Sequence, residues 1–154
     1  MKIADLKNKK IGILGIGYIG SNLLAYLKKF NIDAIKITRE NLNHFKGEQF
    51  DYFVNCAGNS GNFRNNLIET VKSNVNLNTY ILENINIKCS YIYQSSSRIY
   101  GFSKNEKIIF DENSLNNYNN LSLDYVYDGS KKLTESLLIN YSKKVNYKIA
   151  ILRL

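Results

Sequence analysis

The amino-acid sequence predicts an α/β fold, a doubly wound parallel sheet with helices on both faces. Segments with the pattern of buried strands alternate with segments of helical periodicity from end to end, which is typical of parallel sheets with crossover helices. A glycine-rich turn from Gly15 to Gly20 joins the first strand pattern to the first helix pattern. The run Tyr52-Phe53-Val54 does not alternate with polar residues, which indicates a strand covered on both faces.

In the first part of the chain, Lys10–Leu14 predicts the first strand. Ile32–Thr38 and Asp51–Ala57 predict the second and third strands, and Asn31 is placed to end the helix between the first two. That helix is predicted from apolar residues that recur at helical spacing: Ile19, Leu23, Leu24, Leu27 and Phe30.

Arg39–Phe50 is short and polar, with room for a stub strand near Leu42 and for one helical turn. Asn65 to Ile85 is the longest predicted helix, and Ser90–Ser95 predicts a further strand. Repeats and linkers are absent from the sequence.

The last part of the chain begins with Gly101 to Leu123, a polar, asparagine-rich segment that predicts a long loop. A loop of that length in a compact domain is more often functional than idle. Ser122 or Asp124 can cap the next helix, which extends through Tyr141, and Tyr147–Leu154 predicts the final strand.

Length and composition indicate a single soluble domain. The chain has 154 residues, of which 44% are hydrophobic and 22% charged, as in globular proteins. The formal charge is +8, but the lysines are scattered as singles and pairs and form no stripe with aromatic residues. We therefore expect no nucleic-acid partner, and at most a modest attraction to phosphorylated substrates.

The cysteine count and the apolar runs bear on location. Two cysteines, Cys56 and Cys89, form no disulfide framework, which favours a reducing cytoplasm. Glycines interrupt the apolar stretch near the N-terminus and no cleavage site follows it, so a secretion signal is not predicted. A membrane partner is not expected either, because every apolar run is shorter than the about 18 residues of a spanning helix.

The turn Gly15-Ile16-Gly17-Tyr18-Ile19-Gly20 has the G-x-G-x-x-G spacing of a dinucleotide-binding turn. Its first glycine allows a tight turn, the second lets the backbone approach a pyrophosphate, and the third permits close helix–strand packing. The phosphates would face the free N–H groups at the start of the helix. With a strand before it and a helix after it, the turn predicts that Gly15, Gly17, Tyr18, Ile19 and Gly20 bind a nicotinamide cofactor.

The position that reads the cofactor ribose is occupied by Thr38-Arg39-Glu40, at the end of the second predicted strand. The usual acidic residue is not obvious there, because Asp33 lies at the opposite end of that strand. An arginine suits a 2′-phosphate, so the sequence favours NADP over NAD, with Glu40 as an acceptor for the ribose. An ordinary surface arginine is the alternative.

Tyr127 and Lys131 form a Y-x-x-x-K pair inside a predicted helix, which puts both side chains on one face. Tyr100 and Lys104 have the same spacing, but glycine and a polar loop follow Tyr100. A lysine ammonium one turn away is expected to lower the tyrosine pKa and so favour a base. A hydroxyl of the triplet Ser95-Ser96-Ser97 can hold the substrate oxygen while a hydride moves to or from the nicotinamide.

Together these motifs resemble the extended short-chain dehydrogenase/reductase family, the NAD-dependent epimerase/dehydratase group that acts on nucleotide sugars. The resemblance extends over nearly the whole chain and implies a Rossmann-type fold. Its further elements are, by residue number, 51–58 (D-Y-F-V-N-C-A-G), Asn74-Val75 with Thr79, 95–101 (S-S-S-R-I-Y-G) and 151–154 (I-L-R-L).

The resemblance also implies roles for individual residues. Ser96 takes the position of the catalytic serine or threonine, beside Tyr127 as base and Lys131 as the residue that tunes it and holds the ribose. Asn74 supports the lysine through water, and Asn55, Cys56, Ala57 and Gly58 line the cofactor ribose. Helices 65–85 and 127–143 pair in a homodimer.

The chain departs from the family pattern in three respects. The first glycine of the usual G-x-x-G-x-x-G is Leu14 here, and Ser97-Arg98 replaces the Asp-Glu pair of the dehydratases, so epimerisation or carbonyl reduction is expected instead of dehydration. The smaller domain that grips the nucleotide sugar does not follow 147–154. Residues 1–154 therefore resemble the cofactor-binding part of such an enzyme, and a non-catalytic dinucleotide-binding module or inactive fragment is the alternative.

Overall fold

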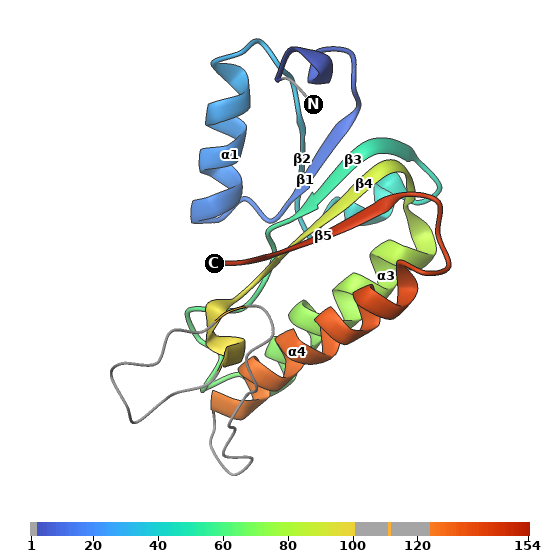
Figure 1. Ribbon diagram of the computed structural model, residues 1–154. Helices are drawn as coiled ribbons and strands as arrows, with labels where there is room; N and C mark the ends of the chain where they lie inside the picture. The colour runs from blue at the N-terminus through green and yellow to red at the C-terminus, as the bar shows by residue number, and fades with distance from the viewer. Residues whose placement is uncertain (1–2, 101–110, 112–123) are drawn as a thin grey trace.

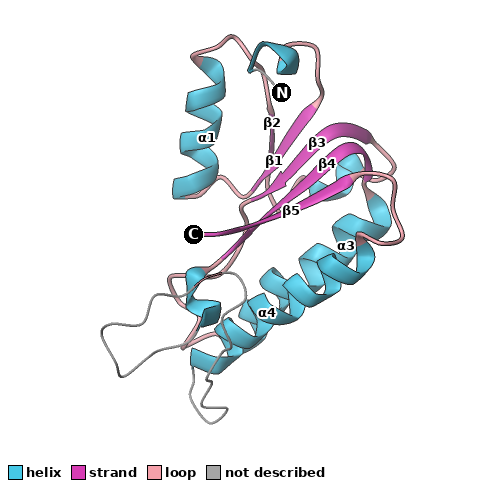
Figure 2. Ribbon diagram, viewed as in Figure 1, coloured by secondary structure: helices cyan, strands magenta, loops and turns pink. Residues whose placement is uncertain are grey.

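A computed structural model of the chain describes residues 3–100, 111 and 124–154. The predicted loop Gly101–Leu123, apart from Asp111, and the alternative helix cap Ser122 lie outside these residues. Five strands form one sheet in the order β2-β1-β3-β4-β5, and every neighbouring pair is parallel (Figures 1 and 2). The strands are β1 (Ile11–Leu14), β2 (Ile35–Ile37), β3 (Gln49–Asn55), β4 (Asn86–Ser95) and β5 (Lys148–Arg153).

Helices lie on both faces of the sheet, and this confirms the predicted Rossmann-type α/β fold. In Figure 1 α1 lies on one side of the sheet, and α3 and α4 lie together on the other. The α-helices are α1 (Tyr18–Lys28), α2 (Leu67–Val71), α3 (Leu77–Asn84) and α4 (Asp124–Tyr141). Short 3-10 helices cover Ile3–Leu6, Leu42–Phe45 and Ser97–Tyr100, and a π-helical turn, η3, covers Lys72–Asn76.

The alternation of side chains along each strand divides the core into two layers. Ile13 and Val54 pack with Leu27 of α1 on one face, whereas Leu14 and Phe53 belong to the cluster on the other face. Because neighbouring residues of a strand point to opposite faces, a strand buried on both sides needs apolar residues at successive positions. Each large side chain so buried contributes about 1.5–3 kcal/mol.

The strand register brings functional segments to one edge of the sheet. Leu14 at the end of β1 pairs with Ile37 of β2 on one side and with Asn55 of β3 on the other. The loops that follow these three strands therefore begin side by side, at the same end of the sheet. The order of the strands changes direction at β1 and β3, and such a switch point is where ligands bind in open α/β sheets.

The second predicted strand is longer than the observed one, and the connection after it contains no strand in the described residues. Asn31 has φ 55°, and the N–H of Ile32 donates to the carbonyl of Leu27, so Ile32 belongs to the turn that ends α1. After β2, the N–H of Thr38 donates to Asn41 Oδ1 over 2.8 Å. This turn leads into the helical turn at Leu42–Phe45, so the helical turn is confirmed and the stub strand near Leu42 is wrong.

The helix predicted over Asn65–Ile85 is interrupted in its middle. Asn66 caps it, with its Oδ1 accepting from the N–H of Glu69, and α2 then passes through the π-helical turn into α3. β4 begins four residues before the predicted Ser90, at Asn86, because the register of β3 and β4 shifts between Phe50 and Tyr52 and adds two earlier pairs.

Candidate active site

The glycine turn has the geometry that each of its glycines was predicted to supply. Gly15 has φ +87°, and a Cβ there would lie 2.5 Å from the backbone nitrogen of Ala57. A Cβ on Gly20 would lie 2.0 Å from the carbonyl oxygen of Gly15, whereas one on Gly17 would meet nothing within 4 Å. Gly15 and Gly20 thus allow close packing, and Gly17 leaves open space where a pyrophosphate would approach.

The start of α1 is available to an anion. Gly17 precedes the helix and no side chain caps it, so its first N–H groups have no partner from a capping side chain. Tyr18 is 87% exposed, and the Ser21 hydroxyl donates back to the Gly17 carbonyl over 2.7 Å. This open helix terminus fits the diphosphate of a dinucleotide.

The predicted ribose-reading residues follow β2 directly, and their charges are already engaged. Arg39 forms an ion pair with Glu69 of α2, through Nη1 and Oε1. A hydrogen bond from the Thr38 hydroxyl lowers the pKa of Glu40, with a smaller contribution from Arg39. Asp33 lies before β2, at the edge of the sheet opposite to this turn.

Residues 55–58, at the end of β3 and just after it, lie between the glycine turn and Lys131. Asn55 is fully buried, and its amide donates to Asn78 Oδ1 and to the Tyr91 hydroxyl, at 3.1 Å each. Its Oδ1 accepts from the N–H of Ala57, so the Asn55 side chain is committed within the protein. Burial raises the pKa of Cys56. Gly58 is exposed, and a Cβ there would lie 3.3 Å from Lys131 Nζ.

Ser96, Tyr127 and Lys131 come together from β4 and α4. The Ser96 side chain, just past the end of β4, lies close enough to the Tyr127 side chain to lower the pKa of Tyr127. Lys131 Nζ lies 6.0 Å from the centre of the Tyr127 ring and donates to the carbonyl of Gln94 over 3.0 Å. Tyr100, the alternative tyrosine, lies in the 3-10 helix after β4, and its hydroxyl accepts from Arg153.

The pKa values differ from the expectation for this pair. Burial raises the pKa of Tyr127, and the groups that oppose the increase are Ser96 and Arg98. Burial also lowers the pKa of Lys131 to about 8. The predicted lowering of the Tyr127 pKa by Lys131 is not seen in this structure, where the groups that lower it are Ser96 and Arg98, and burial disfavours the cationic form of Lys131 itself.

Asn74 lies in the π-helical turn, where two residues of α4 hold it. Its Nδ2 donates to Ser130 Oγ over 3.0 Å, and Thr134 Oγ1 donates to its carbonyl over 2.6 Å. Its own Oδ1 is buried without a hydrogen-bond partner among the described residues and would lie 3.2 Å from a Cβ on Gly58. A buried acceptor without a partner beside the lysine fits the water-mediated support expected of Asn74.

The sequence reasoning missed Ser130 and Thr134, although a signal was present. With Tyr127 and Lys131 they form a polar series at positions i, i+3, i+4 and i+7, which is one face of a helix. That face packs against the π-helical turn, and all four residues are buried. Of the apolar positions that predict this helix, Leu133 is 58% exposed, whereas Leu138 is fully buried.

A second missed group covers the tyrosine. The ring of Phe63 lies 4.7 Å from that of Tyr127, and Arg98 lies near both rings. Arg98 donates to Asp128 over 2.9 Å and to Asp124 over 3.1 Å, and Arg64 donates to Asp124 over 2.5 Å. These contacts join loop and helix residues that are far apart in sequence, and their spacing gives no local signal.

Other classes of site are not supported in the described part of the chain. Groups of three or more histidine, cysteine or acidic residues that could hold a metal are absent from residues 3–100, 111 and 124–154. Over the same residues, each helix is too short or too polar to span a bilayer.

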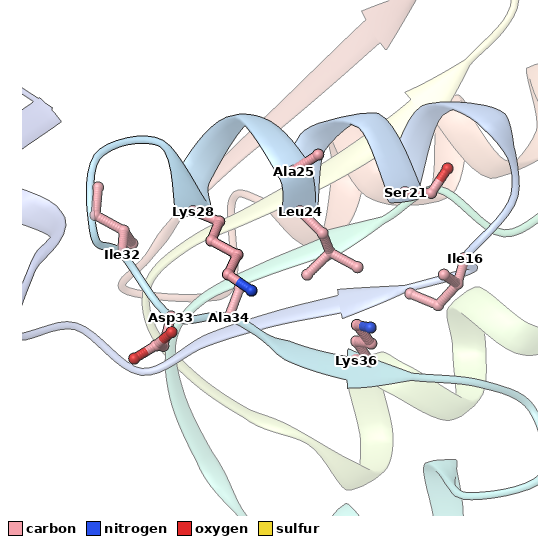
Figure 3. A pocket seen from close by; sticks show the side chains of 9 residues that line it. All are labelled: Ile16, Ser21, Leu24, Ala25, Lys28, Ile32, Asp33, Ala34 and Lys36. Atoms are coloured by element: carbon pink, nitrogen blue, oxygen red, sulfur yellow. The ribbon is translucent and has the colours of Figure 1, made fainter.

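A cavity of about 370 Å³ lies between α1 and β2. Leu24 and Lys28 of α1 reach towards Ile16 and Lys36 on its other side (Figure 3). Ile16 of the glycine turn lines it, but none of the residues predicted to bind the cofactor or to act in catalysis does.

Comparison with known proteins identifies the family to which the chain belongs. The family model described as the NAD dependent epimerase/dehydratase family matches residues 11–154. A search of the curated proteins gave no match.

Solved structures show the same fold at low sequence identity. RMD from Pseudomonas aeruginosa complexed with NADPH has a TM-score of 0.73 at 19% identity, over 95% of this chain and 53% of that one. UDP-glucuronic acid 4-epimerase from Bacillus cereus in complex with NAD has a TM-score of 0.70 at 21% identity, over 94% and 56%. A GDP-6-OMe-4-keto-L-xylo-heptose reductase from C. jejuni has a TM-score of 0.71 at 21% identity, over 99% and 47%. The chain spans about half the length of these proteins.

Proposed function

Because the chain belongs to the NAD-dependent epimerase/dehydratase family, we propose that it is the cofactor-binding part of an NAD(P)-dependent enzyme that epimerises or reduces a nucleotide sugar. The observation that carries this proposal is the placement of Ser96 and Lys131 near Tyr127, with Lys131 also beside Gly58, in the segment against which the glycine turn packs. Relatives in fold include an epimerase with NAD and a protein with NADPH, which supports a nicotinamide dinucleotide as the cofactor.

Four segments of the chain would hold the cofactor. The open start of α1 at Gly17, with Tyr18 and Ile19, would face the pyrophosphate. Thr38 and Arg39 would face the adenosine ribose, and here we propose a slight preference for NADP. The backbone from Asn55 through Cys56 and Ala57 to Gly58, together with Lys131, would line the other ribose. When bound, the nicotinamide supplies the acceptor or donor of a hydride.

The proton transfer is assigned to the chain's own residues. In the oxidising direction Tyr127, as phenolate, takes the proton of a sugar hydroxyl while the hydride leaves the same carbon, and in reduction it returns the proton to the carbonyl oxygen. Ser96 donates a hydrogen bond to that oxygen. Lys131 binds the ribose, Ser96 and Arg98 favour the phenolate, and Asn74 holds a water against the lysine. The buried environment of Tyr127 excludes bulk water from this exchange.

The absence of an acid–base pair beside Ser96 argues against water elimination. Ser97 and Arg98 stand at the positions where dehydratases of the resembled family carry an acid and a base. Arg98 donates to two aspartates and cannot act as a base at neutral pH. Epimerisation and carbonyl reduction need only the tyrosine and the hydride, so they are the reactions we propose.

We also propose an oligomeric state and a cellular compartment for the protein. Ile68 of α2 and Leu133 of α4 are 72% and 58% exposed, and such apolar side chains support a homodimer through helices 65–85 and 127–143. Cys56 and Cys89 are free thiols, which supports a reducing cytoplasm.

A non-catalytic dinucleotide-binding module is the second candidate function. The observation in its favour is that Tyr127 is only 5% exposed and stacks on Phe63, so a substrate would need this contact to open.

The variant Tyr127→Phe separates the two candidates. The purified chain is incubated with NAD or NADP and a panel of UDP- and GDP-sugars, and sugar products are followed by NMR while cofactor binding is measured in parallel. The proposal predicts turnover by the parent chain and a loss of at least about a hundredfold in the variant with cofactor binding retained. Cofactor binding without turnover by the parent would favour the module or an inactive fragment of such an enzyme.

A further inference from the structure

The residue proposed to read a 2′-phosphate, Arg39, is already paired with a carboxylate. Its Nη1 meets Oε1 of Glu69, which lies 30 positions later in the sequence, on α2. The Arg39 and Glu69 side chains are 51% and 35% exposed, so both face the solvent at the side where β2 ends. A ligand that approaches Arg39 therefore also meets Glu69.

Glu69 is held in this position by its own helix. The single hydroxyl proton of Ser73 is shared between the Glu69 carbonyl, 2.7 Å from Oγ, and the Glu69 carboxylate, 3.2 Å from it. Asn66 Oδ1 accepts from the N–H of Glu69, and Ser73 is only 2% exposed. A carboxylate that already accepts from Ser73 loses less side-chain freedom on pairing with Arg39 than a free surface glutamate.

NADP and NAD differ in the group that would lie next to Arg39 and Glu69. A 2′-phosphate carries about two negative charges and several acceptor oxygens, so it would compete with Glu69 for the Arg39 guanidinium or lie beside a like charge. A 2′-hydroxyl is neutral and can donate a hydrogen bond to a carboxylate. Glu69 thus opposes a 2′-phosphate without opposing a 2′-hydroxyl.

We propose that Glu69 is a specificity-determining residue, which restrains the preference for NADP that Arg39 supplies and keeps NAD an acceptable cofactor. This inference rests on the proposed binding of a nicotinamide dinucleotide. The choice between NAD and NADP would then depend on Arg39, which follows β2, together with Glu69, which lies on α2.

The test is a pair of charge-removing variants, Glu69→Gln and the control Glu83→Gln. Glu83 is an exposed glutamate of α3, so both variants change the net charge equally, and glutamine at position 69 can still accept from Ser73. Dissociation constants for NADPH and NADH are measured by nicotinamide fluorescence at low ionic strength. We expect Glu69→Gln to tighten NADPH about tenfold and to change NADH less than about twofold, with Glu83→Gln changing neither.

A second pair, Arg39→Gln and the double variant Arg39→Gln/Glu69→Gln, shows whether the effect acts through the arginine. The inference predicts that the gain for NADPH disappears in the double variant. An unchanged NADPH-to-NADH ratio in Glu69→Gln, or a gain that persists without Arg39, would overturn it while leaving the proposed function intact. Failure of the parent chain to bind either dinucleotide would contradict the proposed function and this inference with it.

Discussion

Replacing either of two glycines by alanine should produce opposite defects, although only three positions separate them. Gly20→Ala puts a Cβ 2.0 Å from the carbonyl oxygen of Gly15, whereas Cβ atoms do not come closer than 3.0 Å to a neighbouring atom. The backbone must therefore move by at least 1.0 Å, the difference between these two distances. Gly17→Ala meets nothing within 4 Å, and φ at this position is −78°, which alanine accepts.

The expected magnitudes follow from these contacts. A shift at Gly15 strains its N–H bond to Ile37 and the neighbouring bond from Cys56 to Leu14, so overpacking and one lost hydrogen bond together cost about 2–4 kcal/mol. Gly17→Ala restricts the unfolded chain and should stabilise the protein by about 0.4–1 kcal/mol. The same methyl group occupies the space where a pyrophosphate approaches, so the Kd for NADH should rise at least about tenfold, about 1.4 kcal/mol.

Urea unfolding and an NADH titration, each run on the parent and both variants, measure these two effects separately. The prediction is a stable Gly17→Ala protein with weak binding, and a destabilised Gly20→Ala protein. The reasoning would be refuted if Gly17→Ala unfolded as readily as Gly20→Ala, because its site would then not be open. It would equally be refuted if Gly17→Ala bound NADH as tightly as the parent.

Three further variants test the packing around Tyr127 and Lys131 by urea unfolding. Burial lowers the pKa of Lys131 from 10.5 to about 8, so between these two pH values the unfolded chain binds more protons and the free energy of unfolding rises with pH. Lys131→Met should stabilise the protein at neutral pH by about 2–3 kcal/mol and remove this pH dependence. The control Lys132→Met, at an exposed position, should keep it. Thr134→Val deletes the donor to the Asn74 carbonyl and should cost about 1 kcal/mol, and no loss would mean that this bond does not hold the π-helical turn. Glu135→Leu removes the buried partner of Arg153 and should lower the free energy of unfolding by about 3 kcal/mol, because the Arg153 charge is left without compensation. The double variant Glu135→Leu/Arg153→Met should recover most of this loss. An equal loss in the single and the double variant would argue against an uncompensated charge.

The sequence predicted the sheet and its glycine turn because both depend on local patterns. Phe53 and Val54 are both apolar because neighbouring residues of a strand covered on both faces are both buried. The spacing of Gly15, Gly17 and Gly20 is set by a single turn. The extent of β2 was not predictable in the same way, because Ile32 is apolar in either role. It is the hydrogen bond from Ile32 to Leu27, after Asn31 in a left-handed conformation, that assigns this residue to the turn.

The candidate site could be predicted only as far as it depends on helical spacing. Tyr127 and Lys131 share a face of α4 by their spacing alone, but the state of the pair depends on burial, which raises one pKa and lowers the other. The ion pairs of Arg98 with Asp128 and of Arg39 with Glu69 join residues 30 positions apart. Such pairs depend on which elements pack together, and no local pattern encodes that.

The most direct test of the account is the binding of NADH and NADPH to the purified 154-residue protein, followed by nicotinamide fluorescence. An open glycine turn, an uncapped start of α1 and a buried lysine beside the end of β3 together predict saturable binding of one dinucleotide per chain, with NADPH slightly tighter. Absence of binding for both dinucleotides in a folded protein would contradict the claim that this site holds a nicotinamide cofactor.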